Sequence, residues 1–257
     1  MHWNIGNLSG KGLSRNADTP LMGTPLMNQR YAALRPGIQW AISWVLALLL
    51  PAMLALASAT AAAQTPAKAA TAPTTAHAVL VMGDSLSAGY GLSASQGWVA
   101  LTADRIAKTR PGWRVVNASI SGETTAGGAA RIEGELQRNK PAVVVIELGA
   151  NDGLRGLPLS QTRANLDRMI RSAKASGAKV LLIGMRMPPN MGRDYTQGFA
   201  DNLTALAKQH GVPLLPFLLE PIATDRNAFQ ADNLHPVASV QPKLRDHVWP
   251  ALAPLLR

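Results

Sequence analysis

Short apolar runs recur at intervals along the chain. The first extends from Ala78 to Met82 and is followed by Gly83. Continuous apolar runs of this length are typical of parallel strands that are buried on both faces. Four similar runs follow, at residues 113–117, 142–148, 179–185 and 212–217. The pattern therefore predicts five parallel strands.

Amphipathic stretches separate these runs. Apolar residues three or four positions apart mark helices at residues 98–109, 125–139, 159–176 and 199–210. Gly177 and Gly211 follow two of these stretches directly, a common signal for the end of a helix. Strands that alternate with helices predict a parallel sheet covered on both faces. Right-handed crossovers then give a three-layer α/β/α sandwich.

Residues 1–63 have a different pattern. Arg30 and Arg35 precede an apolar run at residues 41–57, and small residues follow from Ala59 to Ala63. A positively charged start, an apolar centre and a cleavage region of small residues are typical of a secretory signal peptide. We therefore expect cleavage after Ala63, with Ala59 as the second choice, and a periplasmic or secreted protein.

A retained membrane anchor is the alternative for this segment. The apolar run has 17 residues and contains Pro51, whereas a spanning helix needs about 20 residues. Cleavage is therefore the preferred interpretation. The region ahead of the run is longer than a signal peptide requires, and translation from Met27 would give one of ordinary length.

The rest of the chain divides into a linker and one domain. Residues 64–76 are mostly Ala, Thr, Pro and Lys without apolar periodicity, which predicts a flexible tether. Residues 77–257 have the size of a single domain. The chain contains no cysteine, so an exported form depends on its apolar core for stability.

The net charge and its distribution along the chain indicate which kinds of binding partner to expect. Residues 1–63 hold four basic residues and one acidic residue, so the net charge of +10 falls to +7 without them. The basic residues are scattered and form no long run, which argues against nucleic-acid binding. We expect a monomer with a solvated surface and at most a weak attraction to anionic membrane surfaces.

Polar residues with catalytic potential follow the predicted strands. Ser85 follows the first strand, Gly122 the second and Asn151 the third. The carboxyl ends of parallel strands share one edge of a sheet, and ligands bind there. A later loop carries Asp232 and His235, an acid–histidine pair three residues apart.

These five residues fit a serine hydrolase. A serine hydroxyl is a weak nucleophile until a base takes its proton, and the base needs an orienting carboxylate. Asp232 can meet Nδ1 of His235 and leave Nε2 for Ser85. The backbone N–H groups of Ser85 and Gly122 and the side-chain amide of Asn151 can stabilise an oxyanion. Each residue alone is common in ordinary turns, so the prediction rests on the ordered set.

The sequence around these residues resembles the SGNH (GDSL) hydrolase superfamily, and within it the thioesterase I / lysophospholipase L1 / arylesterase group. The likeness extends over residues 78–257 and is strongest at residues 83–91, 116–124, 147–156, 212–217 and 235–236. It implies a flavodoxin-like five-stranded sheet and no cofactor. It also implies that Ser85, Asp232 and His235 are catalytic and that Ser85, Gly122 and Asn151 form the oxyanion hole.

The same resemblance implies acyl thioesters, aryl esters and lysophospholipids as substrates. One departure is visible, because Asn233 and Leu234 stand where the family has Gly-Ile or Gly-Val before the histidine. These positions are spacers, so the catalytic assignment is unaffected. Asp84 and Asp152 flank the site, where we expect them to make hydrogen bonds that fix the loops.

Two apolar segments lie beside the predicted site. Leu154 and Leu157 follow the Asn151 loop, and Met187 and Pro188 follow the fourth strand. Apolar loops at a sheet edge suggest a wall that binds the acyl chain of the substrate. The alternative is that Leu154 and Leu157 only anchor the next helix.

Other functions remain open from the sequence. A metal-dependent phosphoesterase also uses Asp, Asn and His at strand ends, but it needs several ligands and commonly more than one histidine. Here only His235 is well placed, and we predict no metal site. A non-catalytic envelope protein that binds lipid or glycan would not explain the complete triad. The Gly-x-Ser-x-Gly turn of α/β-hydrolases is absent.

Overall fold

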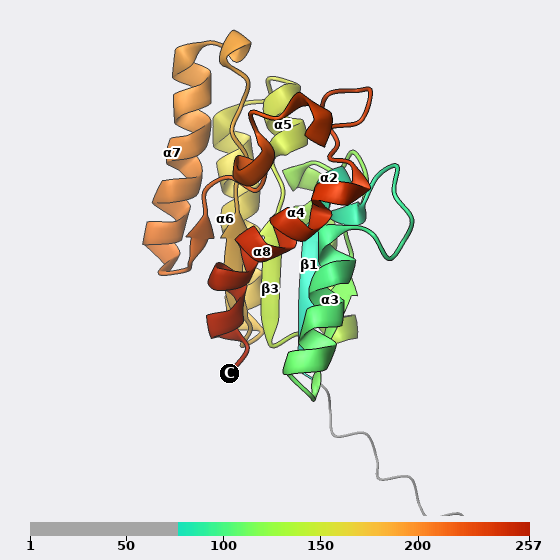
Figure 1. Cartoon of the computed structure of the whole chain (residues 1–257). Coiled ribbons are helices and arrows are strands. Elements are labelled where there is room, and N and C mark those ends of the chain that lie inside the picture. Colours follow the sequence, from blue (N-terminus) through green and yellow to red (C-terminus); the bar gives the residue numbers. More distant parts are fainter. Residues whose placement is uncertain (1–76) are drawn as a thin grey trace, which may run out of the picture. The chain divides into compact units, whose positions relative to one another are not determined.

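The computed structural model describes residues 77–257, and the predicted signal peptide and tether lie outside this range. A sheet forms the centre of the described chain, with helices around it (Figure 1). It has five strands in the order β2-β1-β3-β4-β5. All neighbouring strands are parallel. The strands are β1 (His77–Gly83), β2 (Trp113–Asn117), β3 (Val143–Glu147), β4 (Lys179–Ile183) and β5 (Leu214–Leu215). The prediction of five parallel strands is confirmed.

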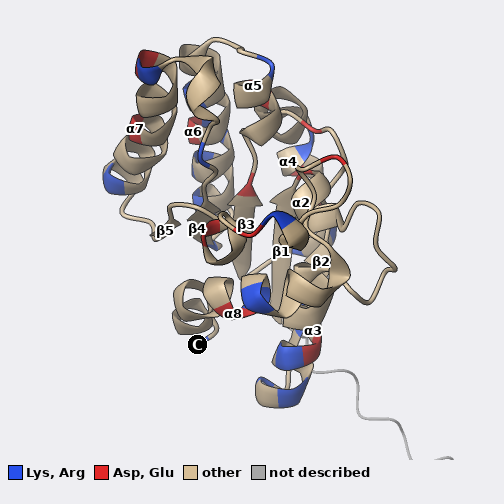
Figure 2. Cartoon of the chain, turned by 45° about the horizontal axis from the view of Figure 1, so that its top comes forward, with Lys and Arg blue, Asp and Glu red and all other residues tan. Residues whose placement is uncertain are grey.

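Five long helices connect or follow the strands. They are α3 (Trp98–Thr109), α4 (Thr125–Asn139), α6 (Leu159–Ala175), α7 (Arg193–His210) and α8 (Gln241–Leu252). Two short helices, α2 (Ser85–Ala88) and α5 (Ala150–Leu154), directly follow β1 and β3. Basic and acidic residues are interleaved on α3 and α7 in the view of Figure 2. None of the helices in the described part of the chain is long and apolar enough to cross a membrane.

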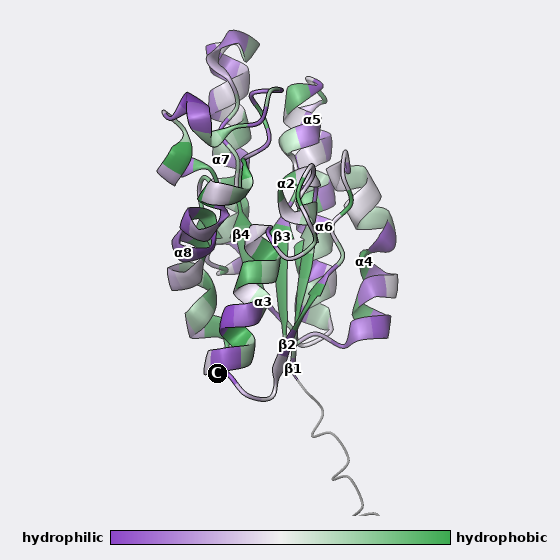
Figure 3. Ribbon diagram, turned by 45° about the vertical axis from the view of Figure 1, so that its right-hand side comes forward, coloured by the Kyte–Doolittle hydropathy of each residue, from purple (hydrophilic) through white to green (hydrophobic). Residues whose placement is uncertain are grey.

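The chain reverses its direction across the sheet after β2, and this reversal distributes the helices. The crossover from β1 to β2 runs one way, and the later crossovers run the other way. With right-handed connections the helices then fall on opposite faces. Helix α3 packs with α8 on one face, and α4, α6 and α7 form a row on the other. Figure 3 shows the apolar strands between these helices, so the predicted three-layer α/β/α sandwich is confirmed.

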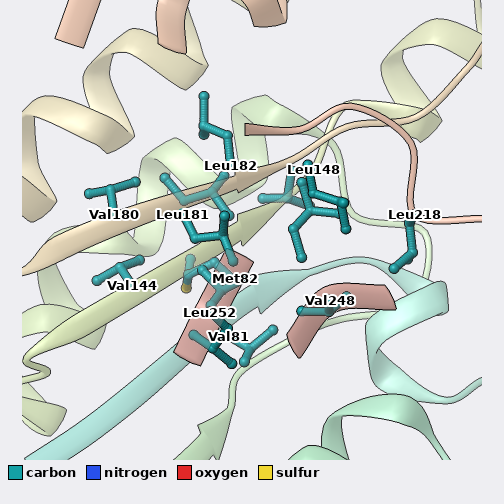
Figure 4. Packing of buried hydrophobic residues seen from close by; sticks show 14 of the residues in the cluster. Val81, Met82, Val144, Leu148, Val180, Leu181, Leu182, Leu218, Val248 and Leu252 are labelled. Atoms are coloured by element: carbon teal, nitrogen blue, oxygen red, sulfur yellow. The ribbon is translucent and has the colours of Figure 1, made fainter. Parts of the chain in front are cut away.

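The core lies on both faces of the central strands. Every residue of β3 is buried, and β1 is buried except at its first residue. The apolar side chains of these strands pack against those of β4 and α8 (Figure 4). Edge strand β2 is only partly buried, which explains why its sequence is less apolar.

Several elements differ from the predicted pattern. Strand β5 has two residues instead of six, because Pro213 and Pro216 flank it and proline donates no hydrogen bond to a ladder. Helix α7 begins six residues earlier than predicted and includes Gly198. A Cβ atom there would lie 2.7 Å from the Leu159 side chain, so glycine permits close packing between α7 and α6. Helices α2, α5 and α8 were not predicted.

Candidate active site

Ser85, His235 and Asp232 form a row of hydrogen-bonded side chains. His235 Nε2 lies 2.8 Å from Ser85 Oγ, and His235 Nδ1 lies 2.7 Å from Asp232 Oδ2. With the Nδ1 proton donated to the carboxylate, Nε2 can accept the hydroxyl proton. This arrangement places a base beside a potential nucleophile and an acid behind the base.

The end of β1 positions Ser85. Ser85 begins helix α2, and Asp84 caps this helix by accepting a 3.0 Å hydrogen bond from the Leu86 N–H. Gly83 makes the tight turn possible, because a Cβ atom there would lie 2.6 Å from Ser87 Cβ. The strand order reverses between β1 and β3, so Ser85 stands at the switch point where ligands bind in such sheets.

A tight turn positions Asp232 and His235. Asp232 Oδ1 accepts from the backbone N–H groups of His235 at 3.0 Å and Leu234 at 2.9 Å. The backbone and side-chain hydrogen bonds from His235, with that from Leu234, lower the pKa of Asp232 to about 2. Asn233 has a φ of +54°, a left-handed conformation that asparagine tolerates better than most residues. Asparagine can therefore occupy this spacer position, where the resemblance leads one to expect glycine.

The two further predicted oxyanion donors lie on neighbouring segments. Gly122 has a φ of +78° in the loop after β2. Asn151 is the second residue of α5, and its Nδ2 donates to the Glu123 carbonyl at 3.0 Å and to Asp84 Oδ2 at 3.2 Å. Both hydrogens of the amide are therefore paired in the absence of substrate. The structure brings Asn151 next to the residue before Ser85 and the residue after Gly122.

Two buried carboxyl groups lie beneath this site. Asp84 is paired as described above, and Glu147, at the end of β3, accepts a 2.7 Å hydrogen bond from Ser87 Oγ. Burial raises the pKa of Asp84 to about 6 and raises the pKa of Glu147 well above its usual range. No role for Glu147 could be predicted from the sequence, because a glutamate at the end of an apolar strand is not distinctive.

Asp152 fixes helix α5 against its neighbours. It is buried and accepts hydrogen bonds from the Thr125 N–H at 2.8 Å and the Thr125 hydroxyl at 2.5 Å. Thr125 begins α4, so the contact joins α5 to α4. The expectation that Asp84 and Asp152 make loop-fixing hydrogen bonds agrees with these contacts.

An apolar cavity of about 260 Å³ opens beside the catalytic turn. Three residues of the predicted acyl wall line it, namely Leu154, Met187 and Pro188. Leu157 does not line it; this residue is half-buried, and its carbonyl accepts from the Tyr195 hydroxyl at 2.8 Å. Met185 and Arg186, from the same segment as Met187 and Pro188, also line it. The sequence missed the other lining residues, which are Phe217, Leu219, Ala223, Phe229, Asn233 and Leu234.

An aromatic ring covers the base. The Tyr90 ring centroid lies 4.5 Å from that of His235, with the planes tilted by 40°. Tyr90 is 52% exposed, so it stands at the mouth of the site. It falls within the motif at residues 83–91, but the pattern alone does not reveal its contact with His235, which is distant in sequence.

A metal centre would need several ligand side chains close together. Within residues 77–257, no three His, Asp or Glu side chains are grouped so that they could hold a metal ion. Asp84, Asn151 and His235 lie at the same edge, but each is engaged in the hydrogen bonds given above.

Comparisons with known proteins agree with this geometry. Residues 81–240 match the model of the GDSL-like lipase/acylhydrolase family. The chain is 50% identical over 186 residues to esterase TesA of Pseudomonas aeruginosa, covering 72% of this chain and 92% of that protein. It is 42% identical over 181 residues to thioesterase 1/protease 1/lysophospholipase L1 of Escherichia coli K12, covering 70% and 86%. The crystal structure of TesA superimposes with a TM-score of 0.68, covering 70% of this chain and 99% of that one.

Proposed function

Because the chain belongs to the GDSL-like lipase/acylhydrolase family and is a carboxylic ester hydrolase, we propose that it acts through an acyl-enzyme on Ser85. The observation that supports this mechanism is the unbroken hydrogen-bonded row from Asp232 through His235 to Ser85. The substrates we propose are aryl esters, acyl thioesters and lysophospholipids. No cofactor takes part in this chemistry.

Acylation begins with attack by the serine oxygen. Ser85 Oγ bonds to the carbonyl carbon while His235 Nε2 takes the hydroxyl proton, and the carbonyl oxygen becomes an oxyanion. The ionised Asp232 stabilises the imidazolium that forms. Collapse of the tetrahedral intermediate breaks the bond to the alcohol or thiol, which leaves with the proton from His235. The acyl group stays on Ser85.

Deacylation repeats these steps with water. His235 takes a proton from the water, the hydroxide bonds to the acyl carbon, and a second oxyanion forms. Its collapse releases the carboxylic acid and returns the proton to Ser85 Oγ. The enzyme is thereby restored without any external proton source.

The oxyanion is stabilised by three donors, the N–H groups of Ser85 and Gly122 and the side-chain amide of Asn151. Both amide hydrogens of Asn151 are paired before substrate binds, so the oxyanion must take over or share one of them. The hydrogen bond to Asp84 is longer than the one to the Glu123 carbonyl, 3.2 Å against 3.0 Å. We expect it to be the one that yields.

The acyl chain of the substrate is proposed to enter the apolar cavity beside the triad. Leu154, Met187 and Pro188 form part of its wall, and Leu234 adjoins His235. Burial of each CH₂ group contributes up to about 0.8 kcal/mol. A cavity of this chemistry favours esters with an acyl chain of several carbons over acetates.

The protein is also proposed to act outside the cytoplasm as a monomer, with at most weak attraction to anionic membrane surfaces. The support for export is the signal-peptide pattern of residues 1–63. N-terminal sequencing of the protein from a periplasmic or culture fraction should give Gln64 as the first residue. Recovery of the uncleaved chain in the membrane fraction would favour a retained anchor.

Loss of the nucleophile tests the proposed mechanism. Ser85→Ala should lower kcat on p-nitrophenyl esters by at least about 10³-fold. Ser93→Ala is the matched control, because Ser93 is an exposed loop serine on the chain just after α2. A Ser85→Ala protein that retained most of its activity would exclude Ser85 as the nucleophile.

A further inference from the structure

Glu123 connects the two proposed oxyanion donors other than Ser85, which are Gly122 and Asn151. Glu123 follows Gly122 directly, and its carbonyl accepts the 3.0 Å hydrogen bond from Asn151 Nδ2. Its own N–H donates to the Ile120 carbonyl at 3.1 Å within the same loop. The backbone of Glu123 therefore affects both where Gly122 presents its N–H and how the Asn151 amide is turned.

An arginine of helix α4 holds the side chain of Glu123. Arg131 Nε lies 2.8 Å and 3.0 Å from the two carboxylate oxygens, and Arg131 Nη2 bonds to the same carboxylate. The Glu123 and Arg131 side chains are only 7% and 19% exposed. A bidentate pair that is shielded from water has a defined geometry and a strong attraction. The oxyanion loop is thus tied to a long helix.

The first turn of α4 leaves space for this carboxylate. A Cβ atom at Gly127 would lie 3.0 Å from Glu123 Oε1 and 3.3 Å from its Cγ, so glycine avoids a tight contact. Thr124 caps the same turn, its hydroxyl accepting from the Gly127 N–H at 3.4 Å. The first turn of α4 therefore accommodates the Glu123 carboxylate in its ion pair with Arg131.

We propose that Glu123 and Arg131 are positioning residues for the oxyanion hole. The pair holds the Glu123 carbonyl where it orients the Asn151 amide, and it fixes the loop that turns at Gly122. Neither side chain touches the reacting atoms, so both act through the two donors. The inference rests on the proposed function, because it assumes that these donors stabilise the oxyanion.

Another ion pair of the same domain provides a matched control. Arg105 Nη2 lies 2.6 Å from Asp246 Oδ1 and joins α3 to α8 on the opposite face of the sheet. It also links two elements, but it contacts none of the proposed oxyanion donors. Substitution of Arg105 should therefore change stability at most, and leave kcat unchanged.

The test compares Arg131→Met, Arg131→Lys and Arg105→Met on a p-nitrophenyl ester. Arg131→Met should lower kcat at least about tenfold with KM within about twofold, because oxyanion stabilisation appears only in the transition state. Arg131→Lys should recover part of this loss, since it keeps the charge but not the planar fork. Equal kcat in Arg131→Met and Arg105→Met, or a change confined to KM, would overturn the proposal.

Glu123→Gln gives a second route if Arg131→Met folds poorly. It removes the buried charge, and Arg131 keeps Glu135 as a partner at 3.4 Å. Glu123→Gln should also lower kcat without a matching rise in KM. Urea unfolding of each variant shows whether the protein is folded under assay conditions, and a folded Glu123→Gln protein with unchanged kcat would overturn the proposal.

Double variants separate this inference from the proposed function. Arg131→Met should lower kcat less in an Asn151→Ala background than in the wild type, because its effect passes partly through Asn151. Fully multiplicative losses would contradict that route. If Asn151→Ala alone keeps full kcat, the proposed oxyanion hole fails. If Asn151→Ala is impaired but Arg131→Met and Glu123→Gln are not, only the positioning role fails.

Discussion

At the scale of single residues, two aspartates near Ser85 have opposite ionisation behaviour. Asp232 accepts hydrogen bonds from backbone and imidazole N–H groups, and its pKa is about 2. Asp84 is buried, and desolvation raises its pKa to about 6. Asp232 is therefore a permanent anion behind His235, whereas Asp84 can bind a proton under mildly acidic conditions.

Asp232→Asn tests the orienting carboxylate. The amide cannot hold the imidazole in the same tautomer or stabilise its charged form, so kcat should fall about 10³–10⁴-fold while KM changes little. Asp225→Asn is the matched control, because Asp225 also accepts from a backbone N–H two residues ahead, at 3.0 Å, but lies outside the triad. Equal kcat in the two variants would remove Asp232 from the mechanism.

Asp84 should make stability depend on pH. Between its ordinary pKa of 3.8 and its folded pKa of about 6, the folded protein holds a proton that the unfolded chain releases. The free energy of unfolding therefore falls as pH rises through this window, and above pH 6 the penalty is roughly 3 kcal/mol. Asp84→Asn should lose this slope, measured by urea unfolding at pH 4.5 and 7.

Other carboxyl groups bear on the same measurement. The raised pKa of Glu147 acts in the same direction, so Glu147→Gln should also reduce the slope. The lowered pKa of Asp232 has the opposite sign, but its stabilisation is lost only below about pH 4. Identical slopes in the wild type and both variants would contradict the account of the buried pair.

The residues proposed for the triad and the oxyanion hole could be predicted from the sequence, since each follows a strand or lies in a distinctive short motif. The residues that position these groups, such as Arg131, could not be predicted from the sequence. Arg131 is one of several arginines on helical segments, and its contact with Glu123 depends on how the first turns of α4 pack. Such pairing is a property of three-dimensional packing, which single-sequence patterns do not record.

At the scale of secondary-structure elements, helices α3, α4 and α6 and the buried strands followed the hydrophobic pattern closely. Helix α5 did not, because five residues are too few to show a helical period. Gly149, with a φ of +118°, starts this helix immediately after β3. The lining of the proposed acyl cavity was only partly predicted, because Phe217, Leu219 and Phe229 have the same local pattern whether they line a cavity or fill a core.

Leu154 and Leu157 form a matched pair for testing the cavity. Leu154→Ser should flatten the rise of kcat/KM with acyl length, since each buried CH₂ contributes up to about 0.8 kcal/mol, or roughly fourfold. Leu157→Ser should leave the profile unchanged, because Leu157 does not line the cavity. The measurement is kcat/KM on p-nitrophenyl esters from acetate to palmitate. A Leu154→Ser profile parallel to that of the wild type would exclude this cavity as the acyl site.

At the scale of the whole described domain, the candidate active site and the first described residue lie at opposite edges of the sheet. The carboxyl ends of the strands carry Ser85, Gly122 and Asn151. The described chain begins at His77, whose N–H donates to the Gly112 carbonyl at 2.7 Å at the amino edge. His77 and Ser85 therefore lie at opposite ends of strand β1.

Removal of residues 64–76 from the proposed mature chain should leave catalysis intact. A chain that starts at His77 should keep kcat/KM within about twofold of one that starts at Gln64. The comparison uses the same p-nitrophenyl ester for both purified proteins. A tenfold loss in a folded protein would show that residues 64–76 contribute to the site.

Covalent labelling tests the central claim most directly. An organophosphonate should inactivate the enzyme with one adduct per chain, mapped by mass spectrometry to the peptide that carries Ser85. His235→Ala should slow this labelling strongly, because the base no longer removes the hydroxyl proton. The adduct should be absent from Ser85→Ala. Inactivation with the label on any other residue, or with Ser85 unmodified, would contradict the account.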